Sequence, residues 1–406
     1  MKFSNSKLGQ AVVMAVAVFG ASAAMAQTVV GGGSSLVAPT VGSEITAVGG
    51  GISYASVGSG KGIAGFLAND ASQFGTGLTG PVHFANSDSA LTTSQTDVNG
   101  SYARSSTDGR LIQLPYIVTP ITIPYVNQPS DITASISLND GDLCGIFSGK
   151  ITNWNQVVNP VTNAPYTSTN APITVVYRAD GSGTSDLLTR HLSAVCSSAN
   201  SNVTFNPTQT FASNFSGGVP SNFVAATGSG GVASNLVSLR TAGTAAIGYL
   251  SPDYTNTTLA PSSAPAASNQ LTVANLRNAQ GQDVAPTYQN ATAALATAQA
   301  PTQANEGNPF AWVPLVPNPT AGYPISGTSN IVVSQCYTNK RVIQSKLVSF
   351  LTNHYTNASF ASIVNGNGFD TVPASFSSLI ASDILSNGNG LNLNIGNTTA
   401  CGSLGR

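Results

Sequence analysis

The chain has 406 residues, of which 41% are hydrophobic and only 7% are charged. This length and apolar content are enough for a full buried core, so the composition argues against intrinsic disorder and for two or three lobes. Because Ser, Thr, Asn and Gln are abundant, we expect a polar but largely uncharged surface.

Residues 1–26 have the pattern of a cleaved secretory signal peptide. Lys2 and Lys7 give a basic start, a short apolar run follows, and an Ala-Met-Ala triplet offers small residues for cleavage. The apolar run is shorter than the roughly 20 residues of a transmembrane helix, and no cysteine near the cut offers a lipid anchor. We expect a periplasmic or secreted chain from Gln27, without a membrane anchor. Its 12 basic and 15 acidic residues give a net charge of −3, which argues against nucleic acid as a partner.

Two segments place small residues before an apolar, helix-like run: residues 31–36 (Gly-Gly-Gly-Ser-Ser-Leu) and 58–62 (Gly-Ser-Gly-Lys-Gly). The first turn of a helix carries unpaired N–H groups and a partial positive charge, and Gly or Ser lets an anion approach the backbone. The alternative for each segment is an ordinary helix cap. Lys61 does not complete a nucleotide P-loop, because Ala55 and Gly62 occupy positions that require Gly and Ser or Thr.

Residues 82–89 read as a strand that ends in a polar loop containing Asp88. A carboxylate repels an anion unless the anion carries a proton, as HPO4²⁻ and H2PO4⁻ do and sulfate at neutral pH does not. In an anion site, Asp88 is therefore expected to act as a filter. Its alternative role is to cap a helix that begins near Ser89.

Residues 173–195 predict a strand, a third small-residue turn (Gly-Ser-Gly-Thr, 181–184) and a helix with an apolar face. Arg178 directly precedes this turn, and a guanidinium binds an oxyanion through two parallel hydrogen bonds. Its alternative role is a salt bridge to Asp180 or Asp186. Three such turns together favour an anion site, but the sequence does not show whether they converge.

Further strand-like runs at residues 245–250 and 331–334, and a helical pattern at 342–352, continue this alternation. The pattern predicts an α/β architecture with mostly parallel sheets. An all-β secreted sandwich is the alternative, but the helix-face spacing of the apolar residues argues against it. Residues 255–308 are rich in Ala, Pro, Thr and Gln, and predict long surface loops with one helix at 291–300.

The cysteines are expected to form disulfides rather than metal sites or free thiols, because we expect the chain to be exported. Of the three possible pairings we favour cysteines that are neighbours in sequence, Cys144 with Cys196 and Cys336 with Cys401, because each bond then lies within one lobe. Each disulfide is expected to contribute about 4 kcal/mol to the stability of the folded chain.

No metal site is expected, because the three histidines are far apart and lack ligand spacing. Asp140 and Asp142 most simply lie in a loop. The sequence has no Gly-x-Ser-x-Gly elbow of a serine hydrolase.

Several motifs, in the same order, resemble the phosphate-binding proteins of periplasmic ABC transport, and most closely their DING subgroup. They are residues 31–36, 57–62, 87–89, 143–150 with Trp154, and 177–184. Residues 307–309 with 312–314, 334–337 and 395–398 also resemble DING sequences, so the resemblance covers nearly all of the mature chain. The DING tetrapeptide itself is absent, and Ser35, Asp180 and Gly181 stand where the subgroup often has Thr, Glu and Ser.

The resemblance implies an α/β, two-lobe type II solute-binding protein fold with a hinge, a ligand cleft and no cofactor. Residues 27–118 and 305–406 are predicted to form the first lobe, and residues 119–304 the second. The resemblance also implies the cysteine pairing given above. The phosphate ligands that it implies are Ser35, Leu36 through its backbone, Ser59, Asp88, Arg178, Ser182, Gly183 and Thr184.

The leading functional hypothesis is a monomeric binding protein that captures inorganic phosphate, without catalysis, for an ABC permease. The alternative is a secreted DING-type phosphatase acting on phosphate monoesters, because the same donors would stabilise a phosphoryl-transfer transition state. However, no histidine lies in the turns of Ser35 or Ser182 to act as a base. A structural or adhesive surface protein would fit the neutral composition, but it does not account for Arg178 or Asp88.

Overall fold

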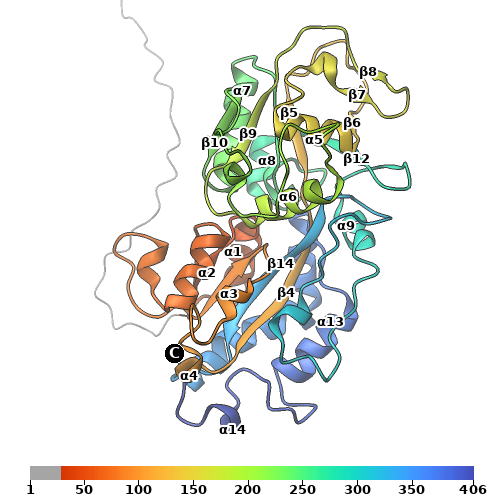
Figure 1. Ribbon diagram of the computed structural model, residues 1–406. Coiled ribbons are helices and arrows are strands. Elements are labelled where there is room, and N and C mark those ends of the chain that lie inside the picture. The colour runs from red at the N-terminus through yellow and green to blue at the C-terminus, as the bar shows by residue number, and fades with distance from the viewer. Residues whose placement is uncertain (1–28) are drawn as a thin grey trace, which may run out of the picture.

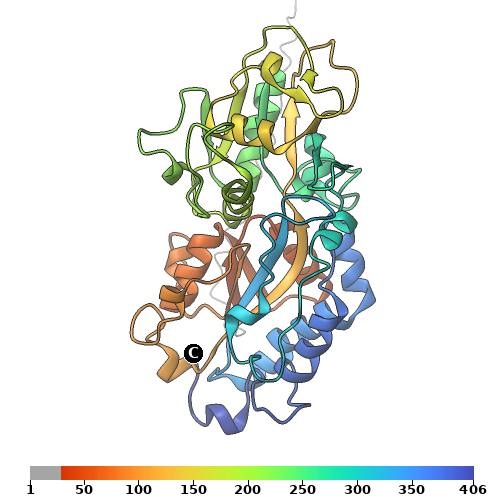
Figure 2. The ribbon, with the colours of Figure 1, turned by 45° about the vertical axis from the view of Figure 1, so that its right-hand side comes forward.

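The computed structural model describes residues 29–406, and the predicted signal peptide lies outside this range. Figures 1 and 2 show two lobes, one above the other, each with a sheet and covering helices. The sheet of the lower lobe has five strands in the order β2-β1-β3-β14-β4. The sheet of the upper lobe has seven, in the order β10-β9-β11-β5-β12-β13 with β6 beside β12.

The lower lobe combines segments from both ends of the described chain. Its strands are β1 (Val29–Gly33), β2 (Ile52–Ser56), β3 (Phe84–Ser87), β4 (Leu111–Pro120) and β14 (Ser326–Ser334). Its helices are α1 (Ala38–Ala47), α2 (Ser59–Ala68), α3 (Thr93–Thr96), α4 (Ser105–Asp108), α10 (Lys340–Ile343), α11 (Ser349–Thr356), α12 (Ala358–Gly366), α13 (Ala374–Leu379) and α14 (Thr398–Cys401). β4 and β14 are buried along their whole length and form the centre of this lobe.

The upper lobe is built from the middle of the chain. Its strands are β5 (Ile123–Val126), β6 (Ser137–Leu138), β9 (Thr174–Arg178), β10 (Phe223–Ala226), β11 (Ala246–Gly248), β12 (Thr272–Arg277) and β13 (Asp283–Val284), with a separate hairpin of β7 (Val158–Asn159) and β8 (Ala164–Pro165). Its helices are α5 (Asp140–Ser148), α6 (Gly183–Val195), α7 (Gly228–Thr241) and α8 (Ala264–Asn269). The remaining helix, α9 (Tyr288–Ala294), packs against β4 and β14.

The domain boundaries at residues 118/119 and 304/305 stay predictions. β4 ends at Pro120 and β5 of the other sheet begins at Ile123, so the chain changes sheets within a short connection. It returns to the lower sheet with β14.

The prediction of mostly parallel sheets is wrong, because both sheets are mixed. β1 pairs in parallel with β2 and β3, whereas β14 runs antiparallel to β3 and β4. In the upper sheet β9 has parallel neighbours, and β5 has antiparallel ones. An apolar run predicts a buried strand but carries no information about the direction of its neighbours, which depends on where the chain re-enters the sheet.

The prediction of surface loops for residues 255–308 is also wrong. This segment contains α8 and β12, and β12 lies inside the upper sheet between β5 and β13. The buried side chains of β12 are only Ala274 and Leu276, so its alternation was weak in the sequence. The expected helix at 291–300 is α9, which begins earlier, at Tyr288, and ends at Ala294.

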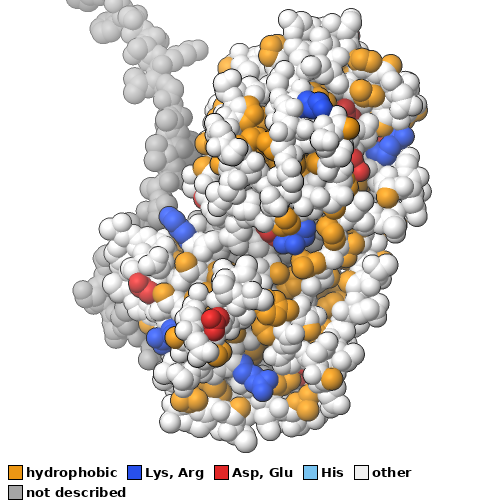
Figure 3. All heavy atoms as spheres, in the orientation of Figure 1, with side chains coloured by type: hydrophobic (Ala, Val, Ile, Leu, Met, Phe, Trp, Pro, Cys, Tyr) orange, Lys and Arg blue, Asp and Glu red, His pale blue; other side chains and the backbone are white. Residues whose placement is uncertain are grey.

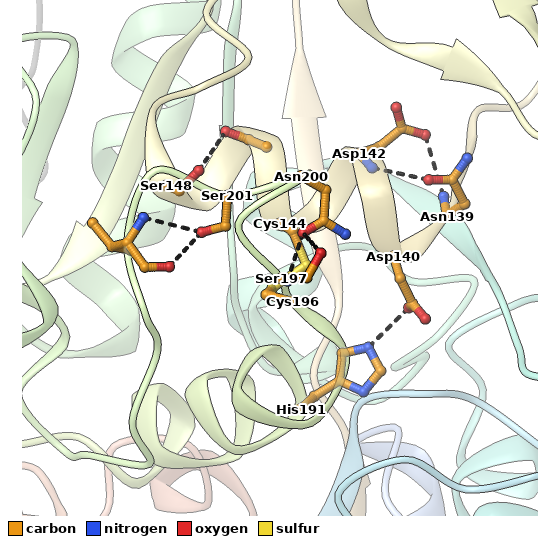
Figure 4. The surroundings of a disulfide bond; sticks show 12 residues. Asn139, Asp140, Asp142, Cys144, Ser148, His191, Cys196, Ser197, Asn200 and Ser201 are labelled. Atoms are coloured by element: carbon orange, nitrogen blue, oxygen red, sulfur yellow. Dashed lines mark hydrogen bonds and ion pairs between the residues drawn. A yellow bond between two sulfur atoms is a disulfide. The ribbon is translucent and has the colours of Figure 1, made fainter.

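Both disulfides join neighbours in sequence, Cys144 with Cys196 and Cys336 with Cys401, as favoured above. The first connects α5 to the end of α6 (Figure 4). Asp140 and Asp142 do not lie in a loop but in the first turn of α5, where Asn139 and Asp142 form a reciprocal cap. Asp140 accepts a hydrogen bond from His191 of α6. The disulfide and this contact hold α6 firmly in place.

The visible face of the molecule is mostly uncharged, with isolated charged side chains (Figure 3). Within residues 29–406, no helix combines the length and the apolar character needed to cross a bilayer.

Candidate anion-binding site

The second and third small-residue turns meet between the two lobes. The Gly60 amide of the lower lobe donates a hydrogen bond to the Gly181 carbonyl of the upper lobe, with an N···O distance of 2.9 Å. A Cβ atom on Gly58, which has a φ of +86°, would lie 2.6 Å from an Asp180 carboxylate oxygen. These two turns therefore contact each other without room for side chains.

Gly183 brings the third turn against the Asp88 loop. A Cβ on Gly183 would lie 2.6 Å from the Cβ of Asp88 and 2.7 Å from its backbone nitrogen, so any side chain would force the lobes apart. Figure 1 shows α6 at the edge of the upper lobe that faces the lower lobe. The structure thus supplies the convergence that the sequence left open.

Two of the turns open helices as predicted. α2 begins at Ser59, and α6 begins at Gly183 with Ser182 as its N-cap. The first turn differs, because its glycines belong to β1 and α1 begins only at Ala38. The N-termini of α2 and α6 both border the meeting point of the lobes, where their N–H groups favour negative charge.

Asp88 does not cap a helix. Its carboxylate accepts a hydrogen bond from the Ser34 hydroxyl at 2.9 Å, and its own amide donates to the Ser59 hydroxyl at 3.2 Å. The next helix, α3, is capped by Thr92 instead. The alternative role proposed from the sequence is therefore excluded.

One carboxylate oxygen of Asp88 is buried without a hydrogen-bond partner among the described residues, and so is the Thr184 hydroxyl. Only 2% of the Asp88 surface is exposed. Burial raises the pKa of Asp88, against the lowering effect of the Ser34 hydroxyl and of the Arg178 charge. The unpaired oxygen, rather than the pKa, is what allows Asp88 to accept a hydrogen bond from a proton-bearing group.

Arg178 lies at the end of β9, also 2% exposed, and it forms the salt bridge to Asp180 that was its alternative role. Nε and Nη2 of Arg178 both donate to the Asp180 carboxylate. Burial acts to raise the pKa of Asp180, but Arg178 and the Gly228 amide outweigh it, and the pKa is lowered. Asp186 pairs with Arg190 instead.

The Asp180 pair orients the guanidinium without using all of its N–H groups. The backbone amide of Arg178 donates to the Tyr249 hydroxyl at 2.9 Å, which holds the end of β9 in place. Nη1 lies 3.5 Å from the Ser229 hydroxyl, so one side of the fork points toward the start of α7. An oxyanion at this point would receive a fixed, buried positive charge.

The eight predicted ligand residues are all buried, and contacts between their turns bring them together where the lobes meet. Ser35 binds across the lobes, since its hydroxyl accepts a hydrogen bond from the Ser229 amide at 2.9 Å and lies 3.0 Å from the Ser229 hydroxyl. The Leu36 amide, by contrast, donates to the Ser34 hydroxyl at 3.1 Å. Among the described residues, no cluster of three or more His, Cys, Asp or Glu could hold a metal ion.

Residues 20–352 match the family described as the PBP superfamily domain. The structure is similar to that of a high-affinity periplasmic phosphate-binding protein, PfluDING, bound with phosphate, with a TM-score of 0.79 and 34% identity over 93% of this chain and 99% of that one. The chain belongs to the DING group of the PBP superfamily. Its two-lobe α/β fold is the predicted type II fold.

The relatives of this DING protein include proteins named as a phosphatase and proteins named as phosphate-binding. It is 36% identical to alkaline phosphatase L of Pseudomonas aeruginosa (strain UCBPP-PA14), over 87% of either chain. Its structure is also similar to that of a phosphate-binding protein from Stenotrophomonas maltophilia, with a TM-score of 0.78, 32% identity, and coverage of 94% of this chain and all of that one.

A fourth small-residue turn of this DING protein, at the start of α7, was not predicted from the sequence. Ser229 contacts both Ser35 and Arg178, and the Gly228 amide donates to Asp180 at 3.0 Å. The signal was present: residues 227–231 read Thr-Gly-Ser-Gly-Gly and follow β10, which is the same arrangement as in the third turn. Ser34 was also missed, although it lies directly beside Ser35.

Proposed function

We propose that this chain binds inorganic phosphate between its two lobes, without catalysis, and acts as a periplasmic monomer that delivers phosphate to an ABC permease. The observation that carries the proposal is the unpaired oxygen of buried Asp88 beside the charge of Arg178. A site with one hydrogen-bond acceptor among many hydrogen-bond donors matches a protonated oxyanion, which has one O–H group and several acceptor oxygens.

The donors are arranged around that acceptor. The hydroxyls of Ser59 and Ser182 each accept a hydrogen bond from a backbone amide, so each retains its own O–H for a ligand. Thr184 contributes an unpaired buried hydroxyl. The helix N-termini at Ser59 and Gly183 add N–H groups and partial positive charge. In a buried site these bonds act in a low dielectric and replace the hydration of phosphate.

Phosphatase activity is the second candidate function, because relatives of this chain carry the name alkaline phosphatase L. A serine nucleophile requires an adjacent base. In residues 29–406, the hydrogen bonds of the histidine rings go elsewhere: His83 to the Val30 amide, His191 to Asp140 and Pro317, and His354 to Glu44 and Tyr116. The carboxylate that contacts the Ser34 hydroxyl is Asp88, which we assign to the ligand, so the arrangement favours binding over turnover.

Titration calorimetry of the mature chain with phosphate and with sulfate tests the proposal. We expect tight, one-to-one binding of phosphate and weak binding of sulfate, because sulfate offers Asp88 no proton. The same preparation is expected to release no phosphate from a monoester. Silence with phosphate would exclude the binding function, and monoester turnover that persists through strict purification would favour the phosphatase.

Replacing Ser229 with alanine is expected to weaken phosphate binding by about 2- to 10-fold, because one hydrogen bond contributes roughly 0.5–1.5 kcal/mol. The change removes the hydroxyl contacts with Ser35 and Arg178 but keeps the Ser229 amide in place. Ser43→Ala, on the exposed face of α1, is the matched control. Equal phosphate affinities in calorimetry for both variants would show that the fourth turn makes no contribution.

A further inference from the structure

A cleft of about 660 Å³ opens in the lower lobe, away from the upper lobe. α4 and α14, which contribute Ser105 and Ala400 to its wall, lie at the far end of this lobe (Figure 1). Clefts of roughly 300–1,000 Å³ are typical of small-molecule sites. None of the residues that line this cleft belongs to the proposed phosphate site.

The walls of the cleft expose large apolar side chains. Val98, Phe310 and Leu404 are 54%, 37% and 37% exposed, and they come from three segments that are distant in sequence. Buried Tyr102 and Leu111 also line the cleft. Figure 3 shows apolar side chains grouped over the lower lobe. Large apolar side chains exposed together are typical of a binding site rather than of an ordinary surface.

Arg110 supplies one positive charge at the wall of the cleft. In the part of the chain that the structure describes, its exposed guanidinium forms no ion pair, whereas nearby Arg104 is paired with Asp108. A Cβ on Gly307 would lie 2.5 Å from Nη1 of Arg110, so the glycine leaves the space that the guanidinium occupies. The backbone of Arg110 is held by the Gln335 amide, at 2.9 Å from the Arg110 carbonyl oxygen.

We propose that this cleft binds a small amphiphilic organic monoanion, with its apolar body on Val98, Phe310 and Leu404 and its carboxylate on Arg110. The unpaired guanidinium of Arg110 beside the apolar wall of the cleft matches a ligand with one negative charge beside an apolar chain. A membrane surface would require a cluster of basic residues, and a stable protein interface would require roughly 800 Å² per partner. The cleft fits neither of these as well as it fits a small ligand with an apolar chain.

Calorimetry with decanoate, decanol and decyltrimethylammonium, each below its micelle concentration, tests the proposal. We expect saturable one-to-one binding of decanoate, weaker binding of decanol and the weakest binding of the cation. Arg110→Gln is expected to weaken decanoate binding about tenfold and to leave decanol unchanged, because it removes a charge-assisted hydrogen bond. Phe310→Ser is expected to weaken both.

Arg341→Gln is the matched control, since Arg341 is also exposed and forms no ion pair among the described residues, but it lies outside the cleft. It is expected to leave decanoate binding unchanged. Unchanged phosphate affinity in Arg110→Gln shows that the variant is folded. Equal binding of decanoate by the parent and by Arg110→Gln, an equal loss in Arg341→Gln, or the absence of saturable decanoate binding would each overturn the proposal.

Discussion

Replacing Arg178 with alanine is expected to weaken phosphate binding by roughly 30- to 5,000-fold, which corresponds to about 2–5 kcal/mol for the loss of one partner of a buried, hydrogen-bonded charge pair. Arg178 is buried, its fork is oriented by Asp180, and its backbone is held by Tyr249. The change removes the positive charge and leaves Asp180 with only the Gly228 amide among these partners. Calorimetry with phosphate measures the loss.

Two further variants keep this experiment interpretable. Arg178→Lys retains the charge but not the planar fork, so we expect an affinity between those of the parent and Arg178→Ala. Arg277→Ala breaks a partly exposed salt bridge to Asp283, far from the site in sequence, and is expected to leave affinity unchanged. Thermal melts check that each variant is folded. Parent-like affinity in a folded Arg178→Ala protein would remove Arg178 from the phosphate site.

Replacing Asp88 with asparagine is expected to reduce the preference for phosphate over sulfate by about 100-fold or more, because like charges brought together cost several kcal/mol. The carboxylate accepts a hydrogen bond from the P–OH group of phosphate and repels sulfate, which has no such group. An amide has no charge and can donate a hydrogen bond to sulfate. Parallel titrations with the two anions, at neutral pH and equal ionic strength, give the ratio.

The Asp88 variant is expected to fold. Burial raises the pKa of Asp88, so the folded protein already disfavours the ionised carboxylate, and the neutral amide removes that cost. Asp283→Asn, on the outer strand β13, is the control that changes an aspartate without touching the site. If Asp88→Asn discriminates between the anions as well as the parent does, the filter lies elsewhere.

The sequence by itself determined the local elements of the site. Ser59 and Gly183 open helices as expected, because small residues precede an apolar helical face in both places. The disulfides followed from the predicted export and from proximity in sequence. The order of several motifs was specific enough to indicate the DING group.

Only the tertiary structure decided how these elements are related. The direction of β14 and the burial of β12 depend on how the chain returns from one lobe to the other, and neither leaves a periodic signal. Ser229 contacts Ser35, and Gly183 lies against Asp88. In both pairs the two residues belong to different lobes and are far apart in sequence. The local sequence pattern predicts whether a segment forms a helix or a strand, because it depends on the propensity and periodicity of neighbouring residues. These contacts depend instead on how the two lobes pack together, which no short segment encodes.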